Sequence, residues 1–276
     1  MGYGQRYFEE RADMPCTTVA QVQNENELND GINHDFDYIC STYLVAAIEK
    51  VNNHTSMCMK AWSKFWMRMA RIKGFKTLGM RIASWGVPPY KGRIWLSALS
   101  PHGFIESDAM IHHPDFRLGK HCFIGSRVVI FERKNGGTIK FDNCVEINND
   151  TILETGMGGQ ISIGSNSSIH PGCYLFAYLS PIIIGSGVML ASQCALYSYD
   201  HGLSSETPIR LQSLSTKGSI EIGDEAWLGF GTIVLSGVKI GKGAAIGAGS
   251  VVTNDIPENA IAVGNPARVV KLRISS

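Results

Sequence analysis

Three absences narrow the interpretation of this sequence before any motif is considered. No two of the seven cysteines form a CxxC pair, and their odd number argues for reduced thiols rather than a disulfide framework. No signal-peptide pattern opens the chain, so we expect a cytoplasmic protein. Residues 155–199 contain no Asp, Glu, Lys or Arg, yet glycines and prolines interrupt them, and this run therefore does not predict a membrane-spanning helix.

The sequence contains a repeat of six residues. An aliphatic or aromatic residue recurs every sixth position in triplets, glycine often follows it, and the fifth slot is small or β-branched. The triplets stand at 118/124/130, 141/147/153, 163/169/175, 184/190/196, 222/228/234 and 240/246/252. The extra residues between successive triplets number 5, 4, 3, 20 and 0, so one insertion is much longer than the others.

A period of six is neither the 3.6 of a helix nor the simple alternation of a strand. It suits a short strand and a turn repeated three times per coil, which gives a triangular prism of parallel strands. Each inward residue would then stack on its counterpart one coil away, about 4.8 Å along the axis. The pattern predicts an all-β fold of about six triangular coils, in which all the extra residues leave from one corner.

The triplets of [LIV]-G-x-x-[small]-x resemble those of the hexapeptide-repeat acyltransferases, over roughly residues 105–273. The resemblance implies a left-handed parallel β-helix, sites between the subunits of a homotrimer, and acetyl-CoA as co-substrate. The resemblance is greatest to the galactoside and maltose O-acetyltransferases.

The stretch YSYDHG, residues 197–202, opens the long insertion. A loop held by a rigid scaffold is a place to build a site, and a positioned imidazole can take a proton from a hydroxyl group. In the resembling enzymes the catalytic histidine follows the last aliphatic residue before the loop by five positions, which here gives His201. Asp200 is adjacent in a strand and would point the other way, so it is a weak candidate for orienting the imidazole.

The stretches DEAWLGFGTIVLSGVKIGKGAAIGAGSVVTNDIP and AVGNPARVVK look like the family's acetyl-CoA section. Carried over by position, the resemblance implies cofactor contacts from Phe230, Ala248, Thr253, Asn254, Arg268 and Lys271. Arg268 suits a phosphate independently, because its guanidinium is a planar fork of donors. Three positions depart from the galactoside enzyme, since Phe230 replaces a serine, Asn254 a lysine and Lys271 an arginine.

The acceptor side departs further from that enzyme. His170 stands where an asparagine contacts the sugar, and Tyr178 stands near the position of an acidic sugar contact. We name both as candidate substrate-binding residues. With these changes, a simple galactoside is not the expected acceptor.

Acidic residues are missing from part of the N-terminal region. Residues 50–105 contain ten Lys or Arg and no acid, whereas residues 1–49 contain nine acids against two basic residues. We therefore divide the chain into an acidic segment that we expect to be poorly ordered (1–55), a basic helix with its linker (56–104), and the β-helix (105–276).

Residues 56–73, SMCMKAWSKFWMRMARIK, predict an amphipathic helix. Its cations lie along one side, and its apolar side comprises Trp62, Phe65, Trp66, Met69 and Ile72. We favour a helix that caps the open end of the β-helix. The alternative is peripheral contact with an anionic membrane, which would place the protein at the inner membrane surface. Nothing else in the chain supports nucleic-acid binding.

The leading functional hypothesis is an O-acetyltransferase that moves an acetyl group from acetyl-CoA to a hydroxyl of a saccharide or similar small acceptor, with His201 as general base. Two alternatives stay open. One is a non-catalytic β-helix that acts as a scaffold or binding module. The other is a zinc-dependent enzyme of the carbonic anhydrase type, but only His170 and His201 lie in suitable coils, and we expect no metal.

Overall fold

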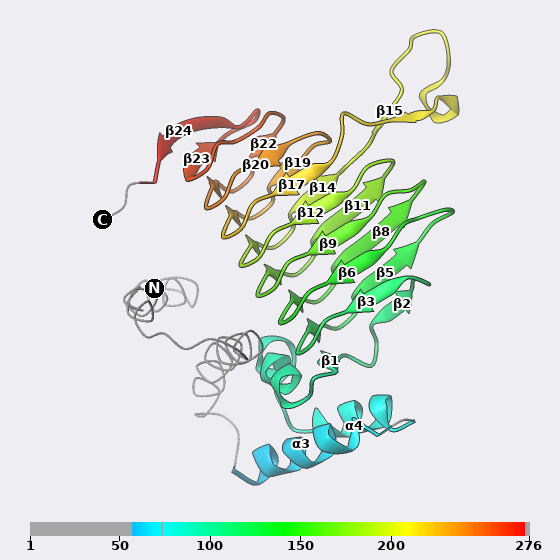
Figure 1. The fold of residues 1–276 in the computed structure, drawn as a ribbon, viewed down its shortest axis with the longest axis vertical. Helices are drawn as coiled ribbons and strands as arrows, with labels where there is room; N and C mark the ends of the chain where they lie inside the picture. The colour runs from blue at the N-terminus through cyan, green and yellow to red at the C-terminus, as the bar shows by residue number, and fades with distance from the viewer. Residues whose placement is uncertain (1–56, 73, 274–276) are drawn as a thin grey trace, which may run out of the picture. The chain divides into compact units, whose positions relative to one another are not determined.

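The computed structural model describes residues 57–72 and 74–273. The acidic segment 1–55, for which we expected poor order, lies outside the described residues. The described part starts with three helices, and short strands follow them (Figure 1). The helices are α3 (Met57–Met69), α4 (Lys76–Ala83) and the 3-10 helix η2 (Tyr90–Leu99).

Three parallel sheets form the faces of a left-handed β-helix. The first sheet contains β1 (Phe104–Ile105), β4 (Phe123–Ile124), β7 (Glu146–Ile147), β10 (Ser168–Ile169), β13 (Met189–Leu190), β18 (Trp227–Leu228), β21 (Ala245–Ile246) and β23 (Ala260–Val263), with β24 (Arg268–Leu272) antiparallel at its edge. The second contains β2 (Met110–His112), β5 (Val129–Glu132), β8 (Ile152–Gly156), β11 (Tyr174–Tyr178), β14 (Ala195–Tyr197), β19 (Ile233–Val234) and β22 (Val251–Val252). The third contains β3 (Phe116–Leu118), β6 (Ile139–Phe141), β9 (Ile161–Ile163), β12 (Ile182–Ile184), β17 (Ile220–Ile222) and β20 (Lys239–Ile240).

The repeat residues form the core in the predicted way. In the first sheet Ile169 is in register with Leu190, and Leu190 with Leu228, so that equivalent residues stack coil upon coil. All the repeat residues except Leu118 are 0–2% exposed. The predicted β-helix is therefore confirmed.

The number of coils is larger than expected. The second sheet has seven strands, one per coil, where the sequence predicted about six coils. The missed coil is the first, whose inward residues include Ile105 and Ile111. Ile111 and Leu118 are seven residues apart, so one additional residue hid this coil from a search for a strict period of six.

The glycine after the repeat aliphatic is needed for close packing between coils. A Cβ atom at Gly229 would lie 2.6 Å from the backbone nitrogen of Ala248, and one at Gly241 would lie 2.4 Å from that of Glu258. Positive φ angles occur two positions later, for example at Gly231 and Glu225. Contact between coils therefore explains the glycine of the repeat, and the turn conformation explains the second glycine.

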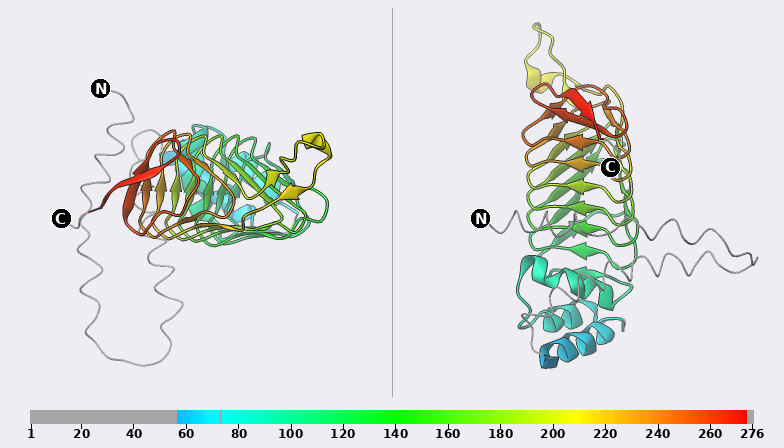
Figure 2. Two further views of the ribbon diagram at one scale, coloured as in Figure 1. Left: turned by 90° about the horizontal axis from the view of Figure 1, so that it is seen from above. Right: turned by 90° about the vertical axis from the view of Figure 1, so that its left-hand side faces the viewer.

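All the insertions leave from the corner between the second and third sheets, as the repeat predicted. We call this the second corner, and the one between the first and second sheets the first corner. The long insertion, residues 198–219, projects from the second corner (yellow in Figures 1 and 2). It contains β15 (Asp200–His201), the 3-10 helix η3 (Ile209–Leu211) and β16 (Leu214–Ser215).

The helices cover the first coil. Met67, Ala70 and Met80 are buried in one cluster with Phe104 and Phe123 of the first sheet. The amphipathic prediction is wrong for three residues of its apolar side, because Trp62, Phe65 and Ile72 are 43–55% exposed, whereas Trp66 is partly buried against this cluster. The residues that pack are smaller: Ser63 and Ala70 are buried, and a Cβ atom at Gly79 of α4 would lie 2.9 Å from Ala70. Close approach of α3 and α4 therefore requires small side chains at Ala70 and Gly79, and the bulky side chains of Trp62 and Phe65 stay outside.

The cysteines follow the expectation in part. Cys58, Cys122, Cys173 and Cys194 are free thiols, and the last three are buried. Cys16 and Cys40 lie outside the described residues.

Candidate functional site

The strongest candidate side chain, His201, stands at the root of the long insertion. β15 and β16 pair in an antiparallel arrangement, with His201 opposite Leu214 and Asp200 opposite Ser215. The Gly202 amide donates to the carbonyl of Ser213 at 3.2 Å, which extends this pairing. The insertion is therefore a hairpin anchored to the second corner, and the imidazole is exposed at its base.

A row of aromatic rings leads to His201 over the outer face of the second sheet. The rings of Tyr178 and Tyr199 are 4.8 Å apart, and Tyr199 approaches the imidazole of His201 edge-on at 6.4 Å. Tyr197 lies 6.1 Å from Tyr199 and contacts Phe176 at 5.1 Å. These residues come from neighbouring coils and form one continuous aromatic surface beside the imidazole.

Tyr178 is nearly buried although it lies on the outside of the prism. Its hydroxyl donates to the carboxylate of Glu154, one coil earlier. Burial and this carboxylate raise the pKa of Tyr178 to about 12, against an opposing effect of Arg133. A neutral phenol held between a carboxylate and an aromatic ring is well placed to position a polar acceptor.

Asp200 does not face the imidazole. Its carboxylate accepts a hydrogen bond from the Ser236 hydroxyl at 3.1 Å, so it fastens the hairpin to the next coil. This arrangement agrees with the alternation of side chains along a strand.

His170 lies at the first corner, directly after β10, whereas His201 and Tyr178 belong to the second corner. Within one chain the structure places the two histidines on different edges of the prism. Of the two proposed acceptor residues, it brings only Tyr178 near His201, through Tyr199.

The predicted cofactor residues are also divided between corners. Phe230 and Ala248 occupy first-corner turns, where the Gly249 amide donates to the Phe230 carbonyl at 2.8 Å. Thr253 and Asn254 follow β22 at the second corner, with the Thr253 hydroxyl donating to Asn254 at 2.9 Å. Arg268 and Lys271 lie on β24 and are exposed.

The two corners therefore carry complementary halves of the predicted site. The first corner holds His170, Phe230 and Ala248, and the second holds Tyr178, His201, Thr253 and Asn254. The second sheet separates the two corners. One chain alone does not assemble all of these residues in one place.

The buried cysteines are poor candidates for a nucleophile. The Cys173 thiol donates to the Ala191 carbonyl at 3.2 Å, and the Cys194 thiol donates to the Gly229 carbonyl at 3.3 Å. The neighbouring Cys194 and burial raise the pKa of the Cys173 thiol, so the nucleophilic thiolate is disfavoured.

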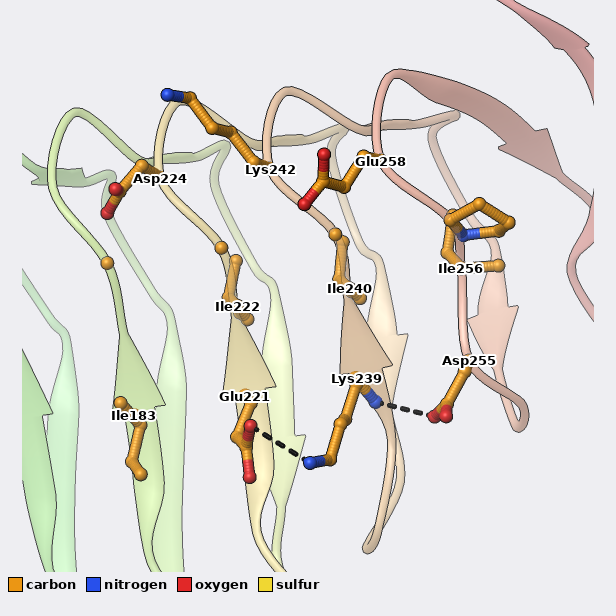
Figure 3. A pocket seen from close by; sticks show the side chains of 14 residues that line it. Ile183, Glu221, Ile222, Asp224, Lys239, Ile240, Lys242, Asp255, Ile256 and Glu258 are labelled. Atoms are coloured by element: carbon orange, nitrogen blue, oxygen red, sulfur yellow. Dashed lines mark hydrogen bonds and ion pairs between the residues drawn. The ribbon is translucent and has the colours of Figure 1, made fainter.

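A groove of about 720 Å³ lies elsewhere, on the third sheet (Figure 3). Glu221 and Lys239 form an ion pair of 3.3 Å there, and the Lys239 amide donates to Asp255. Asp224, Lys242 and Glu258 line the adjoining turns. None of the predicted site residues borders this groove, so we do not assign the chemistry to it.

Among residues 57–72 and 74–273, no group of three or more His, Cys, Asp and Glu side chains could hold a metal ion. No helix of the described residues is long and apolar enough to cross a membrane.

Three residues near His201 were missed as site candidates. Tyr197 and Tyr199 stand in YSYDHG itself, where alternate positions point outward, so the strand period could have identified them. Glu154 gave no such signal, because only the stacking of coils brings it to Tyr178.

Comparisons with known proteins agree with the repeat. Residues 219–254 match a family profile described as bacterial transferase hexapeptide (six repeats). A probable acetyltransferase of Mycobacterium tuberculosis is 31% identical over 170 residues, which cover 61% of this chain and 48% of the relative. A provisionally named acetyltransferase of Saccharomyces cerevisiae is 38% identical over 114 residues, which cover 41% of this chain and 57% of the relative.

One solved structure extends the likeness to three dimensions. An N-acyltransferase from Bacillus cereus, in complex with dTDP and coenzyme A, superposes with a TM-score of 0.50 and 26% identity, covering 57% of this chain and 84% of that one. The matches confirm the resemblance to the hexapeptide-repeat family. The chain spans about half the length of the curated relatives it matches.

Proposed function

We propose that this chain, which carries the hexapeptide repeat of bacterial transferases, transfers an acetyl group from acetyl-CoA to a hydroxyl of a saccharide or similar small acceptor. The observation that carries this proposal is the exposed imidazole of His201, fixed at the root of a hairpin beside an aromatic surface. The relatives named as acetyltransferases support the donor class.

In this reaction the imidazole of His201 takes the proton of the acceptor hydroxyl as its oxygen attacks the thioester carbonyl. The C–O bond forms, the C–S bond breaks, and the imidazolium returns its proton to the sulfur of coenzyme A. A backbone amide would stabilise the oxyanion between these two steps. No acyl-enzyme is needed, which agrees with the buried cysteines.

The aromatic surface supports a saccharide acceptor. Tyr199 offers a ring beside the imidazole, and a sugar ring can pack its C–H face against such a surface. The Tyr178 hydroxyl and the Glu154 carboxylate form a fixed hydrogen-bonding pair next to that ring. We assign acceptor binding to Tyr178, and to His170 when a second chain supplies it.

The division of the site between two corners supports a homotrimer. A closed ring of three chains would bring the first corner of one copy to the second corner of the next, which unites His170, Phe230 and Ala248 with His201. Arg268 and Lys271, exposed on β24, would then contact the phosphates of coenzyme A. A cytoplasmic location is part of the same proposal.

The test is release of coenzyme A thiol from acetyl-CoA with a panel of neutral sugars and amino sugars. Acceptor-dependent release should fall by about 10²–10⁴-fold in His201→Ala. His112→Ala is the matched control, because it removes an exposed histidine from β2 of the same sheet, and it should retain the wild-type rate.

Three outcomes would change the assignment. Release that is unchanged in His201→Ala removes this residue from the mechanism and directs attention to His170. Release with amino sugars alone favours N-acyl transfer, the reaction named for the Bacillus cereus neighbour. Absence of coenzyme A binding in calorimetry favours the non-catalytic scaffold.

A further inference from the structure

Helix α3 has two apolar faces, and only one of them is covered. Ser63, Met67 and Ala70 recur at helical spacing and are buried against α4 and the first coil. Trp62 and Phe65 lie on another side of the same helix and are 43% and 55% exposed. The covered face accounts for capping, so the exposed aromatic residues require another explanation.

The exposed residues continue from α3 onto α4. Trp62 Nε1 donates to the Ile82 carbonyl at 3.1 Å, which joins this face to the end of α4. We call the whole surface the outer apolar patch, and its exposed members are Trp62, Phe65, Ile72, Phe75, Leu78 and Trp85. Trp66 contacts the rings of both Trp62 and Phe65, at 5.7 and 5.4 Å, so the patch is ordered before any partner arrives.

Exposed cations stand on the same two helices as this patch. Lys64, Arg68, Lys76 and Arg81 are all exposed on the same two helices. Residues 50–105 contain no Asp or Glu, so no acid from the helical region competes for these cations. The first acid after this region, Glu106, is buried and paired with Arg93 at 2.9 Å, and the last acid before it, Glu49, lies outside the described residues.

We propose that the outer apolar patch and its cations dock the protein on an anionic lipid surface. Aromatic rings favour the boundary between lipid headgroups and acyl chains, and lysine and arginine favour anionic headgroups. A hydrophobic partner alone would not explain the one-sided charge, and a nucleic acid would not explain the six large apolar side chains. A surface of lipid matches both features.

Docking through this patch does not cover the candidate site. The helices that carry the patch cover the first coil, and His201 leaves the fifth coil, four strand spacings or roughly 19 Å further along the axis. An acceptor carried at a membrane, such as a lipid-linked saccharide, would therefore lie within reach of the site. That extension rests on the proposed function, whereas the docking itself does not.

The experiment is flotation of the full chain with vesicles of phosphatidylcholine alone and of phosphatidylcholine with phosphatidylglycerol. We expect binding to the anionic vesicles, weakened by added salt, with a blue shift of tryptophan emission. Phe65→Ser should weaken binding about tenfold, because an aromatic side chain no longer enters the lipid. Ile183→Ser is the matched control, since Ile183 is 42% exposed on β12, far along the chain from the patch.

The charge contribution is tested separately. Lys64→Gln should weaken binding to anionic vesicles about fivefold, the effect expected for one cation near such a surface. Lys120→Gln removes an exposed lysine outside the patch and should bind like the wild type. Unchanged thermal unfolding of each variant shows that folding is intact.

Three results would overturn the proposal. The first is no flotation with either kind of vesicle. The second is equal, salt-insensitive flotation with both. The third is loss of a self-associated form in Phe65→Ser without any lipid, which would assign the patch to a second copy of the chain. None of these measurements requires acetyl transfer. A failure of membrane docking would therefore leave the proposed function intact, and a failure of the proposed function would leave the docking intact.

Discussion

The β-helix and the helical region before it both carry apolar patterns that are plain in the sequence, but only one of these patterns is buried as predicted. Leu190 and the other repeat residues of the β-helix are 0–2% exposed, apart from Leu118 at the first coil. In α3 the predicted inner residues Trp62 and Phe65 are about half exposed. The two regions differ in which surface covers their apolar residues.

In a period-six repeat each coil is covered by the next coil, which carries the same pattern. The spacing therefore determines both which residues point inward and what they contact. An amphipathic helix shows which residues are apolar, but nothing in its period says which surface will cover them. The small residues Ser63 of α3 and Ala70 directly after it pack against the neighbouring helix, whereas Trp62 and Phe65 remain largely outside.

The sharpest test of this comparison is a pair of truncations. Leu190→Ala should lower the free energy of unfolding by about 2–5 kcal/mol, because it leaves a cavity between Ile169 and Leu228. Phe65→Ala should change it by less than about 0.5 kcal/mol, because its side chain is largely in solvent. Urea unfolding at one protein concentration measures both. Similar losses would mean that the Phe65 face is covered in the native protein.

A second test concerns the junction between the two regions. Arg93 of η2 donates to both carboxylate oxygens of Glu106, at 3.0 and 2.9 Å, and the Glu106 side chain is 8% exposed. Arg93→Met should lower the free energy of unfolding at pH 7 by about 2–3 kcal/mol, because it leaves a buried carboxylate without a counter-charge.

The loss of stability in Arg93→Met should depend on pH, because it acts through the ionisation of Glu106. Burial already raises the pKa of Glu106 above its usual 4.5, despite Arg93. A carboxyl with a raised pKa favours folding at low pH, and this stability is lost as pH rises through the folded-state pKa. The deficit of Arg93→Met should therefore shrink between pH 7 and pH 5. In the double variant with Glu106→Gln the deficit should not depend on pH, and a persistent dependence would contradict the assignment.

The smallest expected effect concerns a residue buried on the outside of the prism. Burial and Glu154 raise the pKa of Tyr178 to about 12, above the ordinary value of about 10. Because the unfolded chain ionises first, the wild type should lose of the order of 1–2 kcal/mol between about pH 10 and pH 12. Tyr178→Phe should lose less over the same range, as measured by urea unfolding. An identical loss in the variant would show that Tyr178 is not shielded as the structure indicates.

Most of the β-helix could be predicted from the sequence, because its rule is local and repeated. The spacing of Ile169, Leu175 and Ile184 is enough to assign three faces and the corner that carries the insertions. The first coil was missed because one additional residue between Ile111 and Leu118 breaks the period. A single local irregularity is enough to hide a coil from a pattern search.

The candidate site could be predicted only in part. His201 is predicted because the repeat stops directly before it and the resembling enzymes have their histidine at that spacing, and Tyr178 because it stands near the position of their acidic sugar contact. Glu154 could not be found, since it approaches Tyr178 through the stacking of β8 on β11. The sequence also did not show that His170 and His201 lie at different corners of the prism within one chain.

The sequence by itself determined the β-helix, the corner of its insertions and the position of His201, because each follows from spacing along the chain. Only the tertiary structure decided which face of α3 is covered and which side chains surround the imidazole. These features depend on surfaces far apart in the sequence, and on whether small side chains such as Gly79 and Ala70 let two helices approach. The period of the helix does not determine which face is covered, because that depends on the shape of the surface it packs against rather than on the order of the residues.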